Sequence, residues 1–191
     1  MSLLESWGSG REFIVNKVSA FSVLFVCTGN ICRSPLGERL LAARLHSSEF
    51  EVTSAGVMAM VGQGMDPEAA QQLHALGGDD AGFVARQFSE KMIANSDLIL
   101  TATRAHRERV LEERPGALRR TFTILEFANL LGSAKGSTPA DLVAWAARHR
   151  STSTLTEIDI PDPYRGGDAI HAEVAGLING AVERIVSAFT H

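Results

Sequence analysis

The residues best placed to do chemistry lie in one short stretch, VCTGNICRSP at positions 26–35. In it a thiol, Cys27, is followed after five residues by Arg33 and then Ser34. A loop that leads into a helix N-terminus offers backbone N–H groups to an anion, and the same positive field stabilises a thiolate. Arg33 adds a planar fork of donors that matches two oxygens of a phosphate group. The spacing therefore predicts a phosphate-binding loop in which Cys27 is the nucleophile.

The other residues of this loop are expected to bind or support. Gly29 allows the backbone to approach the anion closely, and the Ser34 hydroxyl can donate a hydrogen bond to the sulfur, which helps it ionise and later leave. Met60 is expected at the rim of the cleft. Contacts to phosphate and substrate are expected from the whole loop: Thr28, Gly29, Asn30, Ile31, Cys32 and Ser34.

A thiolate that attacks phosphorus also needs a proton donor for the departing oxygen. Asp162 lies between Pro161 and Pro163, so its backbone is stiff and its side chain can be held over a cleft. Tyr164, the only tyrosine, is either a wall against which an aromatic leaving group stacks or an ordinary loop aromatic. Asp159 competes as a proton donor, and we interpret it instead as a brace of the loop.

Short apolar runs alternate with amphipathic runs along the chain. Strands are predicted over 21–27, 51–54, 97–102 and 121–125. Helices are predicted from 34, over 66–77, 89–95, 103–114 and 127–131, from 138, and over 168–189, with a loop over 150–167. This alternation predicts an α/β fold, a doubly wound four-stranded parallel sheet with helices on both faces. Ligands bind beyond the carboxyl ends of such strands, which is where the Cys27 loop begins.

Composition narrows the class of protein and its partners. The 191 residues fit one compact domain, and the net charge of −4 favours neither nucleic acid nor an anionic membrane as a partner. No apolar run is long enough to span a bilayer, and residues 1–20 lack the apolar core of a signal peptide. Two cysteines do not make a secreted disulfide framework. We expect a cytoplasmic monomer or weak dimer.

The six histidines and two cysteines do not predict a metal site. His46, His74, His106, His149, His171 and His191 are expected on polar helix faces or at helix ends, without a spacing that implies catalysis. No Cys-x-x-Cys occurs, and no two histidines lie close in sequence. We therefore expect no zinc site, and the chemistry proposed for Cys27 requires neither metal nor cofactor. The charged run at 104–114 is interpreted as a solvated helix face.

Several motifs, in order, resemble those of low-molecular-weight protein tyrosine phosphatases. They are VLFVCTGNICRSPLGE, SAG at 54–56, ARQ at 85–87, DLILT at 97–101 and DIPDPYR at 159–165, and the likeness extends over residues 22–190. It is strongest to the bacterial branch that partners tyrosine kinases in capsule and exopolysaccharide control. The resemblance implies a flavodoxin-like, phosphotyrosine phosphatase I-like fold. It divides the chain into an N-terminal extension of unknown role, 1–20, and a phosphatase domain, 21–191.

The resemblance also implies roles for particular residues. Cys27 would form a phosphocysteine, Arg33 would bind the phosphate, and Asp162 would act first as general acid and then as the base that activates water. Asn30, Ser34 and Ser54 match the network that holds the loop in shape. The substrate would be a phosphotyrosine protein, and a tyrosine kinase could be the partner. Cys32 would either guard Cys27 by a reversible disulfide or be a plain loop residue.

Two features depart from the family pattern. Many relatives carry histidine where this chain has Phe83, two residues before Ala85-Arg86-Gln87, so one strut of the loop network is expected to be missing or replaced. An insertion-like stretch lies at about 133–156, and its role is open.

Three other functions fit parts of the same pattern. The scaffold also supports arsenate reductases, but an intramolecular disulfide relay needs cysteines outside the loop, so only a variant with an external thiol is compatible. Some relatives remove phosphate from arginine and tend to carry threonine at the position of Ile31, whereas an apolar side chain suits a phenyl ring. A phosphate-binding module without turnover is disfavoured by the joint presence of Cys27, Arg33, Ser34 and Asp162.

Overall fold

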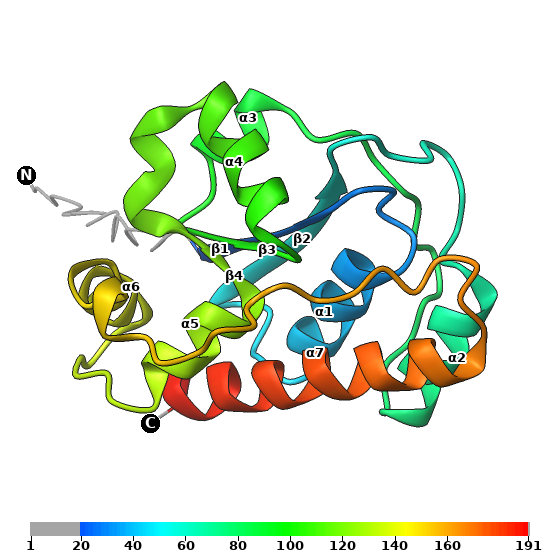
Figure 1. Ribbon diagram of the computed structural model, residues 1–191. Coiled ribbons are helices and arrows are strands. Elements are labelled where there is room, and N and C mark those ends of the chain that lie inside the picture. Colours follow the sequence, from blue (N-terminus) through cyan, green and yellow to red (C-terminus); the bar gives the residue numbers. More distant parts are fainter. Residues whose placement is uncertain (1–19, 191) are drawn as a thin grey trace, which may run out of the picture.

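The computed structural model describes residues 20–190, and its centre is a four-stranded parallel sheet (Figure 1). The strands lie in the order β2-β1-β3-β4. They are β1 (Phe21–Cys27), β2 (Phe50–Gly56), β3 (Leu98–Thr101) and β4 (Thr121–Thr123). Because the chain leaves β1 toward one neighbour and later returns to its other side, the order reverses at β1. The predicted α/β class and parallel sheet are confirmed, and Cys27 ends the strand at which the order reverses.

Helices cover both faces of the sheet, as predicted (Figure 1). One face carries α1 (Arg33–Ala42), α2 (Pro67–Ala75), α5 (Ile124–Leu131), α6 (Pro139–Arg148) and α7 (Asp168–Phe189). The other carries α3 (Glu90–Ala94) and α4 (Arg104–Glu113). Two short 3-10 helices, η1 (Pro115–Arg120) and η2 (Arg150–Thr152), complete the elements of the described residues.

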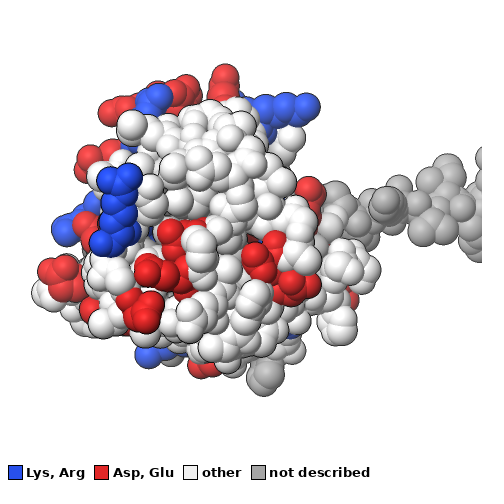
Figure 2. All heavy atoms as spheres, turned by 90° about the vertical axis from the view of Figure 1, so that its right-hand side faces the viewer, with Lys and Arg blue, Asp and Glu red and all other residues white. Residues whose placement is uncertain are grey.

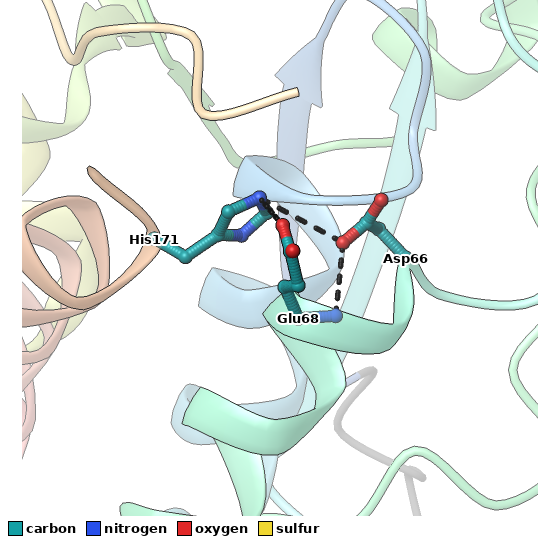
Figure 3. Close-up of side chains that lie close together, drawn as sticks. All are labelled: Asp66, Glu68 and His171. Carbon is teal, nitrogen blue, oxygen red and sulfur yellow. Dashed lines mark hydrogen bonds and ion pairs between the residues drawn. The ribbon is translucent and has the colours of Figure 1, made fainter. Parts of the chain in front are cut away.

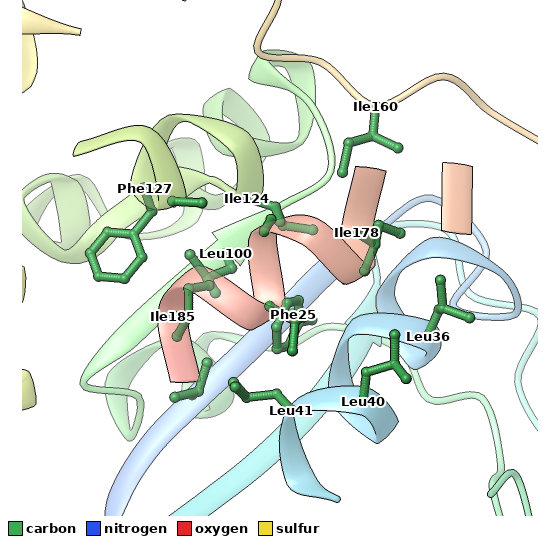
Figure 4. Close-up of a cluster of buried hydrophobic side chains, with 14 of the residues drawn as sticks. Phe25, Leu36, Leu40, Leu41, Leu100, Ile124, Phe127, Ile160, Ile178 and Ile185 are labelled. Atoms are coloured by element: carbon green, nitrogen blue, oxygen red, sulfur yellow. The ribbon is translucent and has the colours of Figure 1, made fainter. Parts of the chain in front are cut away.

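Alternation along β1 separates two cores. Val23 and Phe25 belong to the cluster under α1 and α7, whereas Leu24 and Val26 belong to the cluster under α4. All four side chains are at most 1% exposed, as a strand covered on both faces requires. Figure 4 shows Phe25 meeting side chains from α1 and α7. This burial fixes the position of β1, and therefore of the loop that follows it.

Capping residues explain where several elements begin. Asp66 accepts hydrogen bonds from the backbone of Glu68 and Ala69, and Pro67 opens α2, as predicted. The prediction of a strand over 121–125 was wrong at its end, because Thr123 and Glu126 form a capping box and α5 already starts at Ile124. Local capping therefore overrode the β-branched and apolar character of this stretch.

Three expectations concern regions outside the sheet. Of the N-terminal extension, residues 1–19 lie outside the described residues. The insertion-like stretch at 133–156 contains α6 and η2, and η2 lies in a segment predicted to be entirely loop. Among residues 20–190, no helix combines the length and the apolar character needed to cross a membrane.

Candidate active site

The loop after β1 turns its carbonyl groups in one direction. The carbonyl oxygens of Cys27, Thr28, Gly29 and Ile31 accept hydrogen bonds from backbone N–H groups of the segment 57–66 at 2.9–3.0 Å. In a trans peptide the next N–H points opposite to the carbonyl. The amides that follow these carbonyls therefore point away from the segment 57–66. The loop is thus arranged as a row of donors at the start of α1, as an anion-binding loop requires.

A closed ring of side chains, all buried except Arg86, holds this loop. The Asn30 amide group donates to the hydroxyls of Ser34 (2.9 Å) and Ser54 (2.8 Å), and its oxygen accepts from the Arg86 backbone at 2.9 Å. Ser54 in turn donates to Glu38, which pairs with the Arg86 guanidinium at 3.3 Å. Asn30 is 0% exposed and has φ of 55°, a left-handed conformation that asparagine tolerates better than most residues. The three predicted supports therefore lie together, and the ring adds Glu38 and Arg86, which the sequence reasoning missed.

Glu38 is a buried ionisable member of this ring. The Glu38 residue is 6% exposed, and burial raises the pKa of its carboxyl, while the Ser54 hydrogen bond and the charge of Arg86 oppose that rise. Phe83, at the position of the family histidine, is buried in the main core, with the Arg39 guanidinium 5.5 Å from its ring centre. Both polar atoms of the Asn30 side chain are nevertheless hydrogen-bonded. The network is therefore complete without a histidine at that position.

The nucleophile candidate lies at the centre of the loop. The Cys27 sulfur is 2.9 Å from the Ser34 hydroxyl. The Ser34 oxygen accepts from Asn30, and its proton can go to the Cys27 sulfur at 2.9 Å or to the more distant Ala55 carbonyl at 3.4 Å. A thiolate at Cys27 would favour the hydrogen bond to sulfur. Cys32 is also buried and free. Burial, followed by the negative charges near it, raises the pKa of the Cys32 thiol well above its ordinary value, so Cys32 is a poor nucleophile beside Cys27.

Arg33 is buried beneath the loop with its donors aimed at the site. Its guanidinium donates to the Ile160 carbonyl at 3.2 Å and to the Thr28 hydroxyl at 3.4 Å. One terminal nitrogen also lies 2.7 Å from the Asp162 carboxylate. The Nε atom is buried and makes no hydrogen bond within the described residues. This fork therefore retains a donor for a phosphate oxygen, and Asp162 is the group a phosphate would displace.

The segment that carries Asp162 is anchored at one end. Ile160 is 1% exposed, and its backbone N–H donates to the carbonyl of Ala102, just after β3. The Asp162 side chain is 53% exposed, and its second oxygen accepts from the Tyr164 backbone. Asp159 accepts from the Arg104 backbone at 2.7 Å and pairs with the Arg104 side chain. It lies at the start of α4 and acts as the brace that was expected.

His106 is a residue that the sequence reasoning placed wrongly. It is 7% exposed rather than on a polar face, because α4 turns it inward toward the loop. Its ring nitrogens lie 2.9 Å from the Thr28 hydroxyl and 2.8 Å from the Thr103 hydroxyl. Burial, together with the charge of Arg33, lowers the pKa of His106 to about 4. A neutral imidazole therefore holds Thr28, and the spacing Thr103-x-x-His106 of a capped helix was the signal available in the sequence.

A cavity of about 170 Å³ opens above the loop. Ile31, Met58, Met60 and Tyr164 give it apolar walls, and Cys27, Arg33 and Asp162 lie at its polar end. Met58 and Tyr164 are 74% and 40% exposed. The face turned to the right in Figure 1 has a broad area without charged side chains, with acidic side chains gathered beside it (Figure 2). Met60 and Tyr164 therefore line the cavity as expected, and Met58 joins them.

A glycine permits the close approach of β2 to the loop. A side chain at Gly56 would meet the Thr28 carbonyl at 2.4 Å and the Asn30 amide at 3.0 Å. Any larger residue would push the loop out of register with the Ser54 hydroxyl two residues earlier. This contact gives the SAG motif a structural reason.

Fold and site together define a class: an α/β protein with a buried thiol in a phosphate-type loop and a carboxyl above it. The family model described as low molecular weight phosphotyrosine protein phosphatase matches residues 22–139. The chain belongs to this family, whose members are hydrolases. The match ends before Asp162, so the role of that residue rests on the geometry.

Individual relatives extend over most of the chain. The low molecular weight protein-tyrosine-phosphatase Wzb of Escherichia coli K12 is 36% identical over 159 residues, which cover 82% of this chain and 87% of Wzb. The crystal structure of the tyrosine phosphatase AmsI of Erwinia amylovora is 30% identical and has a TM-score of 0.70. The alignment covers 91% of this chain and 95% of AmsI. The structure of the YwlE arginine phosphatase of Geobacillus stearothermophilus is 26% identical and has a TM-score of 0.68. The alignment covers 87% of this chain and 91% of YwlE.

Proposed function

We propose that this protein hydrolyses phosphotyrosine on proteins through a phosphocysteine intermediate. One observation carries the proposal: the Cys27 sulfur, the Arg33 fork and the Asp162 carboxyl meet at the polar end of one apolar-walled cavity. The nucleophile, the phosphate-binding group and the proton donor of such a reaction are all within reach of one bound group.

In the first step, the phosphate group takes the place of the Asp162 carboxylate on Arg33. The loop amides and the guanidinium bind its equatorial oxygens, and the Cys27 thiolate attacks phosphorus from below. Asp162, freed from Arg33, takes up a proton from solvent or from the entering phosphate monoester. The P–O bond to the phenol then breaks as the S–P bond forms, and this proton goes from Asp162 to the departing oxygen. The Ser34 hydroxyl stabilises the thiolate before attack and again when it leaves.

In the second step, the phosphocysteine is hydrolysed. Asp162, now a carboxylate, removes a proton from a water molecule, which attacks phosphorus in line with the sulfur. The S–P bond breaks and Cys27 returns as a thiolate while inorganic phosphate forms. Arg33 and the loop amides stabilise the charge on the oxygens in both transition states.

The apolar walls favour an aromatic leaving group. Ile31 is 6% exposed, and together with Met58, Met60 and Tyr164 it surrounds the space above the sulfur. A phenyl ring buries apolar surface there, whereas a guanidinium would lose hydration without a carboxylate partner of its own, since Asp162 is required for catalysis. Arginine phosphatase activity remains the second candidate, because a solved arginine phosphatase shares the fold at 26% identity.

The test is phosphate release from a phosphotyrosine peptide and from the matching phosphoarginine peptide, without added metal. Wild-type protein should turn over phosphotyrosine, and Cys27→Ser should abolish turnover while still binding the peptide. Preference for phosphoarginine would overturn the proposed substrate and leave the mechanism. If neither peptide is hydrolysed but arsenate is reduced with an external thiol, the phosphatase proposal is wrong.

Several finer points belong to the same proposal. A phosphotyrosine-bearing tyrosine kinase is the proposed partner, as in the capsule systems that the family resemblance suggests. The proposed state of the protein is a cytoplasmic monomer or weak dimer.

Cys32 is the proposed redox guard: oxidation of Cys27 to a sulfenic acid would allow a disulfide with the Cys32 thiol and loss of water. Recovery of activity by dithiothreitol after peroxide, absent in Cys32→Ser, would support that role.

A further inference from the structure

Three ionisable side chains meet where the start of α7 passes the start of α2 (Figure 3). His171 comes from the first turn of α7, Asp66 caps α2, and Glu68 lies in its first turn. The His171 Nε2 atom is 3.0 Å from Glu68 Oε2 and 3.8 Å from Asp66 Oδ1. All three atoms lie within 4.8 Å of one another. The site draws on segments separated by most of the chain.

The histidine is the unusual member of this group. The His171 side chain is 1% exposed, and its Nε2 atom is buried without a hydrogen bond. Buried polar nitrogens nearly always have a hydrogen-bond partner, and leaving one without costs free energy. Figure 3 shows Nε2 turned toward the carboxylates of Asp66 and Glu68. The nitrogen therefore points into the cluster at ion-pair distance from Glu68, but it makes no hydrogen bond there.

Contrary to the expectation of no zinc site drawn from residue spacing, we propose that Asp66, Glu68 and His171 bind a divalent transition-metal ion, zinc being the best match. Imidazole nitrogen and carboxylate oxygen are zinc ligands with bonds of about 2.0–2.2 Å, and tetrahedral ligands at that distance lie roughly 3.4 Å apart. The separations of 3.0 and 3.8 Å from His171 bracket this value. Two carboxylates compensate the charge of the ion, and hard magnesium or calcium would prefer an all-oxygen site.

Exposure around the cluster gives the ion a path. The Asp66 and Glu68 side chains are 15% and 41% exposed, so an ion can enter from solvent and keep water in its remaining position. Asp66 Oδ1 also accepts the backbone N–H groups of Glu68 at 3.0 Å and Ala69 at 3.2 Å, which holds it in place.

The site lies beside the catalytic loop without being part of it. The Asp66 backbone N–H donates to the Ile31 carbonyl at 2.9 Å, and α7 begins directly after the segment that carries Asp162. An ion bound to α2 and α7 would therefore join the elements that flank two regions. These are the phosphate loop, residues 27–33, and the acid segment, residues 159–165, which carries Asp162. Its role is to brace them, and the proposal does not depend on the phosphatase mechanism.

The test is zinc binding by isothermal titration calorimetry, in a Cys27→Ser/Cys32→Ser background that removes competing thiols. One equivalent of zinc should bind and should raise the thermal unfolding midpoint. His171→Gln should weaken binding by more than the roughly 10–100-fold that loss of an outer partner costs. Glu68→Gln, at a partly exposed position, should also weaken binding and serves if His171→Gln does not fold. With Co²⁺ as the probe, the visible absorption of a low-coordinate nitrogen and oxygen site should appear.

The matched control is a second, exposed cluster. His74, Asp79 and Asp80 also come together, but there His74 Nε2 is hydrogen-bonded to Asp80 at 2.6 Å. His74→Gln should leave zinc binding and the rise in unfolding midpoint unchanged. Absence of binding in the parent, its survival in both His171→Gln and Glu68→Gln, or its loss in His74→Gln would overturn the proposal. The cluster would then be an ion pair of a protonated His171.

Discussion

The phosphate loop and the acid segment face each other across one cavity, yet they are built differently. Asn30, Ser34 and Ser54 are each 0% exposed, and their polar groups are paired in a closed ring. Asp162 is 53% exposed and stands on an irregular segment whose buried anchor is Ile160. The phosphate loop is therefore part of the buried core, whereas the segment with Asp162 lies largely on the surface.

The difference follows from what each region does in the proposed reaction. Stabilising charge on phosphate oxygens requires donors that do not reorganise, and burial in a satisfied network supplies such donors. Transferring a proton first to phenol and later from water requires a carboxyl that can leave Arg33 and shift between two partners. A group fixed as rigidly as Asn30 could not do both. The predictions that follow separate these two kinds of construction.

The largest effect is expected where the two regions touch. Arg33→Lys replaces a planar fork by a point charge, so it loses the paired donors to phosphate as well as the contacts to Ile160 and Asp162. We expect kcat/KM for a phosphotyrosine peptide to fall by about 10³-fold or more, since even one transition-state donor is worth roughly 10²–10³. Steady-state kinetics measure this loss, and a fall below tenfold would contradict the assigned role.

Removing the proposed proton donor should reduce activity while leaving the fold intact. Asp162→Asn should lower kcat by on the order of 10²-fold for phenyl phosphate, and less for an aryl phosphate whose phenol leaves without a proton. The urea midpoint should stay near that of the wild type, because this side chain is half exposed. Asp159→Asn is the matched control and should change kcat little. Equal losses in the two variants would argue against Asp162 as the acid.

A substitution in the side-chain ring around Asn30, unlike Asp162→Asn, should lower the stability of the protein. Asn30→Ala removes one hydrogen bond from each of the buried Ser34 and Ser54 hydroxyls and leaves the Arg86 N–H without its acceptor. It also replaces asparagine at φ 55° by a residue that tolerates this left-handed conformation less well. We expect a loss of about 3 kcal/mol in the free energy of unfolding, together with lower kcat. Asn30→Gly should recover about 1 kcal/mol of that loss by relieving the backbone. Urea denaturation measures both values.

The smallest expected effect concerns His106 and pH. Its pKa is about 4 in the folded protein and 6.5 ordinarily, so the unfolded chain binds more protons between these values. Its contribution to stability is therefore fully present above about pH 6.5 and is lost as pH falls toward 4, a change on the order of 2–3 kcal/mol. The difference between wild type and His106→Gln should show this slope. His46→Gln, at an exposed histidine, should retain it.

Residues that act within one contiguous motif could be predicted from the sequence, and residues brought together by tertiary packing were missed. Cys27, Arg33 and Ser34 stand in one contiguous motif, and the prolines around Asp162 mark its segment, so their positions could be read directly. The strands could be read as well: β1 and β3 contain nearly continuous apolar runs, and β2 and β4 are short runs with β-branched residues. β4 was misjudged only where the cap at Thr123 outweighs the apolar residues that follow.

The missed residues owe their setting to tertiary packing. Glu38 and Arg86 meet only when α1 lies beside the segment after Phe83. The sequence placed His106 and His171 on polar helix faces or at helix ends, and both are buried by the elements that their helices face. Composition does not reveal such burial, since the same residue types on another face would be solvated.

The ion pair between Arg33 and Asp162 has a consequence for product release. In the free protein the guanidinium already holds an internal counter-ion at 2.7 Å, so any anion that enters must exchange with it. Inorganic phosphate left after hydrolysis faces the same exchange in reverse, as the carboxylate returns to its partner. This exchange costs the substrate and the product alike, but only the substrate has an aromatic ring that buries against the cavity walls and offsets the cost. A site built for phosphate can in this way stay open in a solution rich in free phosphate.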